Sequence, residues 1–220
     1  FLASKFPNKK TVVVASNVNI EDVYPRGVLT QPLREKEIVK IGFVGGLNKR
    51  KGVDVLLHAA SKLINGFGYH NLQFHLVGGY KDFELESMLH ELGISENFVL
   101  HGLKSKSEVL ELMKSFDLYV QPSLSEGLPR ASIEAMSCGL PVIATNLPGF
   151  CEILDSVVLV STNDAEGLAS KIEELLTSYA DYNKQSKNNL KTAGNFLYSN
   201  LHQKRCAYYR SFIELTTEEI

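Results

Sequence analysis

Short, mostly apolar runs rich in β-branched and aromatic residues recur along the chain, and longer stretches of mixed polarity separate them. Such continuous apolar runs are typical of strands in a parallel sheet that is covered on both faces. The pattern predicts strands at Thr11–Ala15, Val39–Val44, Leu72–Val77, Phe98–Leu100, Leu118–Gln121, Pro141–Thr145 and Val157–Val160.

Between these runs, apolar side chains recur every three to four residues, which is the spacing of one helix face. Val53, Leu56, Leu57 and Ala60 form the first such set, and similar sets lie within 85–92, 109–113 and 168–175. Two polar helical segments, at about 180–198 and 201–217, follow the last strand. This alternation predicts an α/β fold, a Rossmann-like parallel sheet of about six strands with helices on both faces.

Composition and charge narrow the class of protein. The 220 residues are 44% hydrophobic and 22% charged, which is ordinary for a globular protein. With a formal net charge of -2 the chain has no positive electrostatic field that would attract a polyanion, and the basic clusters at 48–51 and 104–106 are short. We therefore expect no nucleic acid partner. No apolar run approaches the roughly 18 residues of a membrane span, and no signal peptide is evident. These features predict a soluble, cytoplasmic protein, and peripheral contact of the full-length protein with the inner membrane face stays open.

Three loops carry glycines where predicted strands end and helices begin, at 45–52, 78–80 and 122–129. In an open parallel sheet, ligands bind at the carboxyl ends of the strands. Glycine lets a ligand approach the backbone closely, and a helix N-terminus offers free N–H groups suited to phosphate. The three loops are therefore expected to converge on one cleft.

Two glutamates flank the start of the helix that follows the third loop. Pro129 suits the first helical position, and Cys138-Gly139 marks the helix end. Glu126 then lies just outside the helix, where the helix dipole alone could favour it. Glu134 lies inside an apolar stretch, where a carboxylate needs a hydrogen-bonding partner such as a ribose diol or must face solvent. Spacing alone leaves both alternatives open.

The same residues resemble a known family. Glu126 and Glu134 are separated by seven residues, and this specific spacing is embedded in a longer pattern. That pattern resembles the C-terminal half of retaining glycosyltransferases with the GT-B fold, glycosyltransferase family four (group one), over about residues 11–178. The matching segments are Gly45–Gly52 with Lys51, Val77–Gly79, Phe98–Gly102, Pro122–Pro129, Ile133–Met136, Gly139, Pro141–Ala144 and Glu152.

The resemblance implies one half of a GT-B enzyme. In that family the C-terminal domain holds a nucleotide-sugar donor, and an N-terminal domain, which we expect this chain not to include, holds the acceptor. The chain opens on Phe1, which also suggests a piece of a longer protein. We expect a Rossmann-like nucleotide-sugar-binding domain over 1–200 and a C-terminal helix over 201–220 that packs toward the N-terminal domain. The whole enzyme would transfer a sugar, UDP-linked by preference, to a polysaccharide, glycolipid or other glycan, and the fragment alone would be inactive.

Roles for single residues follow from the same resemblance. Glu126 would lie beside the transferred sugar, Lys51 would neutralise the diphosphate, and Glu134 would bind the ribose hydroxyls. No Asp-x-Asp pair is present to hold a metal beside a diphosphate, so we expect neither metal nor cofactor. The other positions assigned to substrate binding are Gly45, Gly46, Arg50, Gly78, Leu103, Ser123, Gly127 and Leu128.

One departure from the family pattern keeps other functions open. The family usually carries an arginine directly after the first glycine of the loop at 45–52, and this chain has Gly46 there. Loss of a bidentate donor should weaken phosphate binding unless Arg50 replaces it. A sugar-nucleotide-binding module without catalysis is therefore one alternative. A sugar-nucleotide epimerase on the same two-domain fold is another, although it does not share the Glu-to-Glu pattern.

Overall fold

The structure, a computed structural model, describes residues 20–79 and 84–217, with the side chains of residue 208 and of 211–217 left out of the description. The predicted strand Thr11–Ala15 lies outside the described residues. The other six predicted strands are all present, with ends that differ in places.

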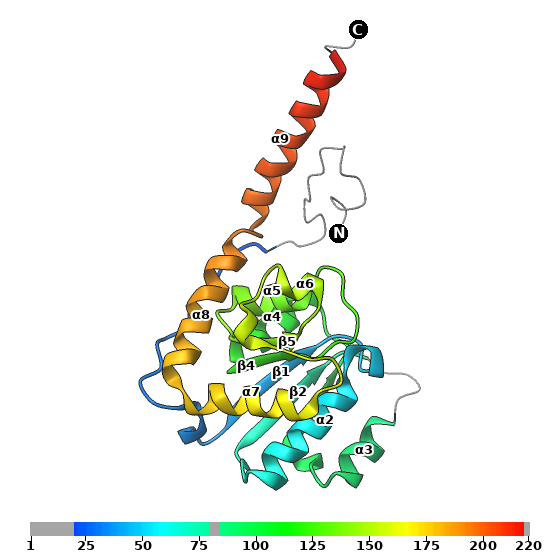
Figure 1. The fold of residues 1–220 in the computed structure, drawn as a ribbon, viewed down its shortest axis with the longest axis vertical. Helices are drawn as coiled ribbons and strands as arrows, with labels where there is room; N and C mark the ends of the chain where they lie inside the picture. The colour runs from blue at the N-terminus through cyan, green and yellow to red at the C-terminus, as the bar shows by residue number, and fades with distance from the viewer. Residues whose placement is uncertain (1–19, 80–83, 218–220) are drawn as a thin grey trace.

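Six parallel strands form one sheet in the order β3-β2-β1-β4-β5-β6 (Figure 1). This order runs outward in both directions from β1 and β4, so the loops after these two strands meet at a switch point of the sheet. The predicted Rossmann-like sheet is confirmed. The strands are β1 Val39–Val44, β2 Leu72–Val77, β3 Phe98–Gly102, β4 Leu118–Gln121, β5 Val142–Thr145 and β6 Leu159–Val160.

Three strand boundaries differ from the prediction. β3 continues to Gly102, and β5 begins one residue late because Pro141 has no N–H for the ladder. β6 keeps only two residues, since a 3-10 turn at Ser156–Val158 takes up the start of the predicted run. The Asp155 side chain accepts from the Val157 N–H and so stabilises that turn.

Helices cover both faces of the sheet (Figure 1). α2 and α7 pack together over one face, and α4 and α5 pack together over the other. Two hydrophobic clusters, one on each side of the sheet, hold these layers in place. The helices are α2 Val53–Ser61, α3 Leu85–Glu91, α4 Lys106–Ser115, α5 Arg130–Ser137, α6 Pro148–Cys151, α7 Ala165–Thr177, α8 Tyr179–Gly194 and α9 Tyr198–Thr217.

The start of α5 corrects one prediction. Pro129 is the residue before the helix, with ψ of 79°, and the first helical residue is Arg130. This non-helical ψ makes the helix begin one residue later than the proline rule suggests. The end of the helix agrees with the prediction, because Gly139 follows Cys138 with φ of 68°.

The two C-terminal helices, α8 and α9, lie at different distances from the sheet. α8 packs against α5, and its Ser186 Oγ and Asn189 Nδ2 donate to the carbonyl oxygens of Gly139 and Leu140 at 2.7 and 2.8 Å. α9 projects away from the sheet (Figure 1). The expectation that residues 201–220 contact an N-terminal domain stays a prediction. Within the described parts of the chain, every helix is too short or too polar to span a membrane.

Candidate functional site

The loops after β1 and β2 touch at the carboxyl edge of the sheet. A Cβ atom on Gly78 would lie 1.9 Å from the carbonyl oxygen of Gly45, so this approach requires glycine. Gly78 also has φ of 148°, a conformation that other residues rarely adopt. Beside this contact, the Leu47 N–H donates to the Gly79 carbonyl oxygen at 2.9 Å. Two of the three predicted loops therefore meet.

The loops after β1 and β4 meet at the switch point. A Cβ atom on Gly52 would lie 1.9 Å from the Pro122 carbonyl oxygen, and Gly52 has φ of 70°. The Leu124 N–H donates to the Arg50 carbonyl oxygen at 2.9 Å. The loop after β1 thus meets both of the other glycine-containing loops at one edge of the sheet, and their convergence on one cleft stays a prediction.

This convergence pairs the two residues that were predicted to be catalytic. Lys51 Nζ lies 2.6 Å from Glu126 Oε1, and both side chains are largely buried, with 19% and 11% exposed. Ser123 Oγ donates to the same carboxylate oxygen at 2.8 Å. The Asn48 side chain accepts from the Lys51 N–H at 3.1 Å and fixes the turn that carries the lysine. Lys51 and Glu126, which lie 75 residues apart in the chain, therefore form one charged unit.

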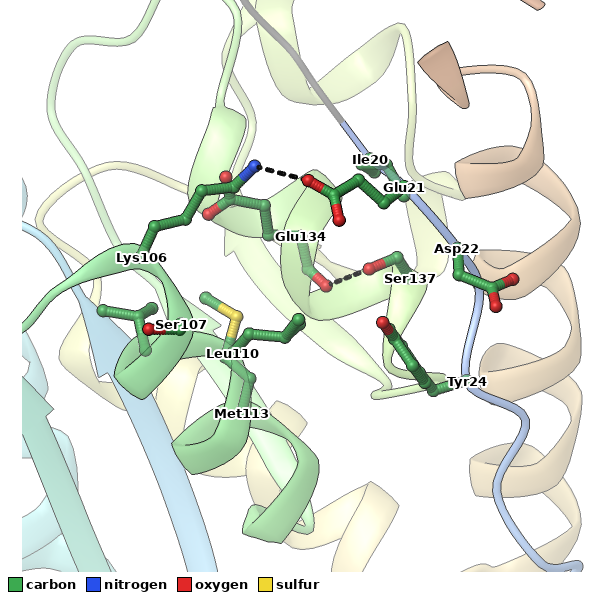
Figure 2. A pocket seen from close by; sticks show the side chains of 11 residues that line it. Ile20, Glu21, Asp22, Tyr24, Lys106, Ser107, Leu110, Met113, Glu134 and Ser137 are labelled. Carbon is green, nitrogen blue, oxygen red and sulfur yellow. Dashed lines mark hydrogen bonds and ion pairs between the residues drawn. The ribbon is translucent and has the colours of Figure 1, made fainter. Parts of the chain in front are cut away.

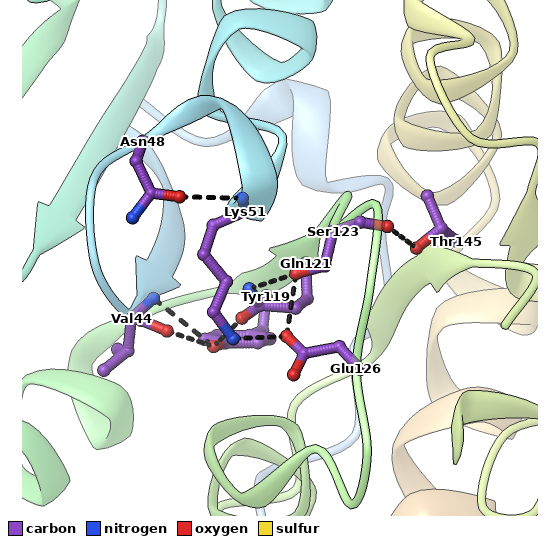
Figure 3. A network of polar contacts seen from close by, with 8 residues as sticks. All are labelled: Val44, Asn48, Lys51, Tyr119, Gln121, Ser123, Glu126 and Thr145. Carbon is purple, nitrogen blue, oxygen red and sulfur yellow. Dashed lines mark hydrogen bonds and ion pairs between the residues drawn. The ribbon is translucent and has the colours of Figure 1, made fainter. Parts of the chain in front are cut away.

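A line of buried polar groups leads from the sheet to this pair (Figure 3). Tyr119 OH donates to Gln121 Oε1 at 2.7 Å, and Gln121 Nε2 donates to Ser123 Oγ at 3.0 Å. Thr145 Oγ1 donates to the Ser123 carbonyl oxygen at 2.5 Å from the neighbouring strand. Burial raises the pKa of Tyr119, and Glu134 and Glu126 raise it further, so the phenol keeps its proton.

Glu134 lies on α5 and lines a different space, a cavity of about 380 Å³ between α4, α5 and the segment 20–24 (Figure 2). Burial raises the pKa of its carboxyl group, and Lys106 and Arg130 partly offset that effect. Opposite Glu134, Lys106 Nζ lies 3.9 Å from Glu21 Oε1. No described side chain donates a hydrogen bond to the Glu134 carboxylate, which leaves its oxygens available to a ligand.

The structure therefore separates the two glutamates. No described contact joins Glu134 to Lys51 or Glu126, and the cavity at Glu134 is not lined by the three loops. Both carboxylates nevertheless lie near enough to Tyr119 to act on its pKa. A ligand that reaches both would extend from the cavity, past the start of α5, to the Lys51–Glu126 pair.

The remaining predicted residues border the site in different ways. Gly46 and the Arg50 side chain are exposed. Gly127 is exposed at the turn before α5, and Leu128 is half-buried against the cluster under that helix. Leu103 is 84% exposed, and its Cδ2 would lie 3.2 Å from a Cβ on Gly79. It forms an uncovered apolar wall beside the loop after β2.

Sequence reasoning missed Tyr119 and Gln121. They alternate along β4, so they lie on the same face of the strand, and they are polar members of an otherwise apolar run. That spacing signals a shared polar face. Lys106 belongs to the basic cluster at 104–106 and received no site role from the sequence, and the structure places it in the lining of the Glu134 cavity.

The geometry suits an elongated anion with a polyol group. Lys51 offers a cation, and the first N–H groups of α5 lack partners within the helix and carry a partial positive charge. Glu134 offers an acceptor for hydroxyl groups at one end. At the other end, Glu126 keeps Oε2 free, since its described contacts all use Oε1.

Comparisons with known proteins give the family of this chain. Residues 30–192 match the family model Glycosyl transferases group 1. An uncharacterized glycosyltransferase of Methanocaldococcus jannaschii is 31% identical over 173 residues, which cover 77% of this chain and 44% of that protein.

Solved structures share the fold. A TarM variant of Staphylococcus aureus, in complex with fondaparinux, alpha-GlcNAc-glycerol and UDP, has a TM-score of 0.76 at 17% identity, covering 94% of this chain and 41% of that one. HepE of Anabaena, in complex with UDP and glucose, has a TM-score of 0.72 at 21% identity, covering 80% of this chain and 49% of that one. The parallel six-stranded sheet with its covering helices matches GT-B glycosyltransferase structures.

The lengths of the matched proteins show how much of each relative this chain represents. The chain spans less than half the length of the first curated relatives that it matches, at 44%, 44% and 41% of their lengths. The family model covers most of the chain, including the loops at 45–52, 78–80 and 122–129, and the residues of the Lys51–Glu126 pair. The chain therefore belongs to the glycosyl transferases group 1 family.

Proposed function

We propose that this chain is the donor-binding, C-terminal half of a retaining glycosyltransferase of family four, and that it uses a UDP-sugar. One observation carries the proposal. The three glycine loops bring Lys51 and Glu126 together at the start of α5, while the carboxylate of Glu134, on the same helix, lines a cavity and accepts no hydrogen bond from the described side chains.

The nucleoside part of the donor would occupy the cavity at Glu134. A ribose has two neighbouring hydroxyl groups, and each can donate to one carboxylate oxygen. Such a charge-assisted pair would compensate the cost of burying Glu134. HepE was solved with UDP bound, which supports a uridine nucleotide for this chain as well.

The diphosphate would lie between the cavity and the loops. Lys51 would turn from Glu126 toward the phosphate oxygens, and the N–H groups of Gly127 and Leu128 and of the first turn of α5 would face them. Binding of an anion by a helix N-terminus and a lysine needs no metal, so we propose that the donor binds without one. Gly45, Gly46 and Gly78 would let the phosphates approach the backbone.

The reaction would be transfer with retention at the anomeric carbon. The bond between that carbon and the diphosphate oxygen breaks, and the leaving diphosphate gains negative charge while the sugar gains positive charge. Lys51 would stabilise the leaving group, and the carboxylate of Glu126 would stabilise the sugar ring. Ser123 holds Glu126 before the donor arrives, which reduces the cost of organising this carboxylate in the transition state, whereas Lys51 exchanges its contact with Glu126 for the phosphate oxygens.

The acceptor side is a proposal about the longer protein. A second, N-terminal domain would bind a polysaccharide, glycolipid or other glycan acceptor and close the cleft, and the complete enzyme would work in the cytoplasm, if necessary at the inner membrane face. Alone, this chain should bind nucleotide weakly and transfer no sugar, because an open cleft leaves the donor hydrated and unpositioned.

A sugar-nucleotide-binding module without catalysis is the second candidate. Gly46 stands where the family usually has an arginine, and the Arg50 side chain is exposed rather than turned into the site. Lys51 is then the one cation of the loop 45–52 that the described structure places against Glu126. A binding module would keep donor affinity and lack turnover.

One set of measurements tests both candidates. This chain is titrated calorimetrically with UDP, GDP and ADP, and the full-length protein is assayed with UDP-sugars while NMR identifies the anomeric configuration of the product. We expect UDP to bind most tightly and the configuration to be retained. Binding without turnover would favour the binding module, and an inverted product or no nucleotide binding would refute the main proposal.

A further inference from the structure

The polar groups between β4 and Glu126 form a chain of hydrogen bonds with one direction (Figure 3). Tyr119 is fully buried and keeps its proton, so its hydroxyl can donate to Gln121 Oε1 at 2.7 Å. The Val44 N–H lies 3.3 Å from the same hydroxyl and supplies it with a donor in turn. The phenol therefore has both a donor to accept from and an acceptor to donate to.

The orientation of the Gln121 amide follows from that contact. The Tyr119 hydroxyl also lies 3.3 Å from the Val44 carbonyl oxygen, but its 2.7 Å contact with Gln121 Oε1 is the shorter one, so the phenol proton goes to Gln121. The amide nitrogen then faces Ser123, where it donates to Oγ at 3.0 Å. Ser123 Oγ therefore accepts from Gln121 and uses its single proton to donate to Glu126 Oε1, and the two oxygens are 2.8 Å apart. With the amide reversed, Gln121 would present an oxygen to Ser123 and attract the proton away from Glu126.

The end of this chain is the carboxylate beside Lys51. Ser123 and Lys51 both donate to Oε1. This leaves Oε2 pointing away from the two donors and sets the plane of the carboxylate. Gln121 is 2% exposed and Ser123 is fully buried, so water has little access with which to replace either link.

We propose that Tyr119 and Gln121 are positioning residues for Glu126. Tyr119 fixes the orientation of the Gln121 amide, and Gln121 directs the Ser123 proton to Glu126 Oε1, which holds Oε2 toward the transferred sugar. The proposal rests on the proposed function of Glu126. It assigns to the interior of β4 a part in the chemical step, although neither side chain touches the substrate.

The test uses Tyr119→Phe and Gln121→Met in the full-length protein, with matched controls on α8. Tyr182→Phe also removes a buried phenol hydroxyl, which donates to the Asp117 carbonyl oxygen at 2.9 Å, and Gln185→Met also replaces a buried amide. We expect each β4 variant to lower kcat by about three- to tenfold, the effect of one hydrogen bond, with the UDP dissociation constant unchanged. The α8 controls should leave both values unchanged.

A double-mutant cycle separates positioning from general stability. If Gln121 acts through Glu126, Gln121→Met should cause no further loss of kcat in a Glu126→Gln background. Losses that multiply in the double variant, a weakened affinity for UDP, or a kcat equal to that of the parent protein would each overturn the proposal.

A second measurement does not depend on activity. A crystal structure of Gln121→Met should show the Glu126 carboxylate rotated off the Ser123 hydroxyl, and an unchanged Glu126 rotamer would refute the positioning role. If the parent protein itself neither binds UDP nor transfers sugar, the proposed function fails, while the rotamer still decides whether the polar chain positions Glu126.

Discussion

Gly149 and Gly127 lie in direct contact, since a Cβ atom on Gly149 would be 1.9 Å from the Gly127 carbonyl oxygen. Gly149 belongs to α6, the short helix after β5, and Gly127 belongs to the loop that carries Glu126 to the start of α5. The position of Glu126 therefore depends on a glycine from the next strand–helix unit.

Substituting this glycine should displace the loop. Gly149→Ala is expected to destabilise the fold by about 1–3 kcal/mol through overpacking. It should also lower turnover of the full-length enzyme by about tenfold or more, because small misplacements of reacting groups are costly. Gly194→Ala is the control, since a Cβ atom there meets open space. Thermal unfolding and steady-state rates check both variants. If Gly149→Ala has the melting temperature and turnover of the parent protein, the loop at Gly127 can move aside without cost and the prediction is wrong.

The two glutamates should fail differently when each is replaced by alanine. Glu134→Ala removes a charge-assisted acceptor of the ribose and should weaken the binding of UDP by about 1.5–3 kcal/mol, or about 10- to 150-fold. Glu126→Ala frees Lys51 to meet the diphosphate, so affinity for UDP should not fall, whereas kcat of the full-length enzyme should. UDP titration of this chain is the direct measurement. Equal weakening in both variants would mean that both residues only support the loop and helix.

The buried carboxyl of Glu134 predicts a pH dependence of stability. Burial raises its pKa above the ordinary value of 4.5, so the folded state binds the proton more tightly than the unfolded state does. Stability from this group is therefore present below pH 4.5 and is lost as the pH rises through the higher pKa of the folded state. Glu134→Gln should melt at a higher temperature than the parent at pH 7, and this difference should shrink toward pH 4.

Glu96→Gln is the matched control for that experiment, because it makes the same replacement of a carboxylate by an amide at an exposed position. Its melting temperature should follow the parent at every pH. The prediction is wrong if Glu134→Gln also follows the parent throughout the range.

Asp117 should contribute to stability well away from the site. It is 5% exposed and accepts from Lys36 Nζ at 2.7 Å and from the Lys40 N–H at 2.9 Å, which ties the segment before β1 to β4. Asp117→Ala leaves the Lys40 N–H without its acceptor and should cost about 1–3 kcal/mol. Glu111→Ala removes the partner of an exposed ion pair with Lys114 and should cost less than about 1 kcal/mol. Urea unfolding compares the two, and equal costs would contradict the role of Asp117.

Much of the fold could be predicted from local pattern. Apolar, β-branched runs such as Val39–Val44 form strands wherever two helical layers cover them, and the 3.6-residue spacing around Leu56 and Leu57 locates one of those layers. The exceptions have local causes. Pro129 adopts a non-helical ψ and delays α5, and a 3-10 turn shortens β6.

The site was predictable only in part. Glycine positions indicated which loops approach each other, because Gly52 and Gly78 admit backbone contacts that a Cβ would block. The pairing of Lys51 with Glu126 was not predictable, since it depends on β1 and β4 being neighbours in the sheet. Local pattern also could not show that Glu134 faces a cavity between α4 and the segment 20–24.

The strand order has a consequence for synthesis on the ribosome. β1 pairs with β2 along six residue pairs and with β4 along two, so strands β1 to β3 can associate before β4 is made. Lys51 emerges 75 residues ahead of Glu126, and in that interval the nascent chain presents the lysine without its carboxylate. The charged pair is completed only when β4 docks beside β1, so the first half of the domain associates without the charge compensation that Glu126 gives Lys51.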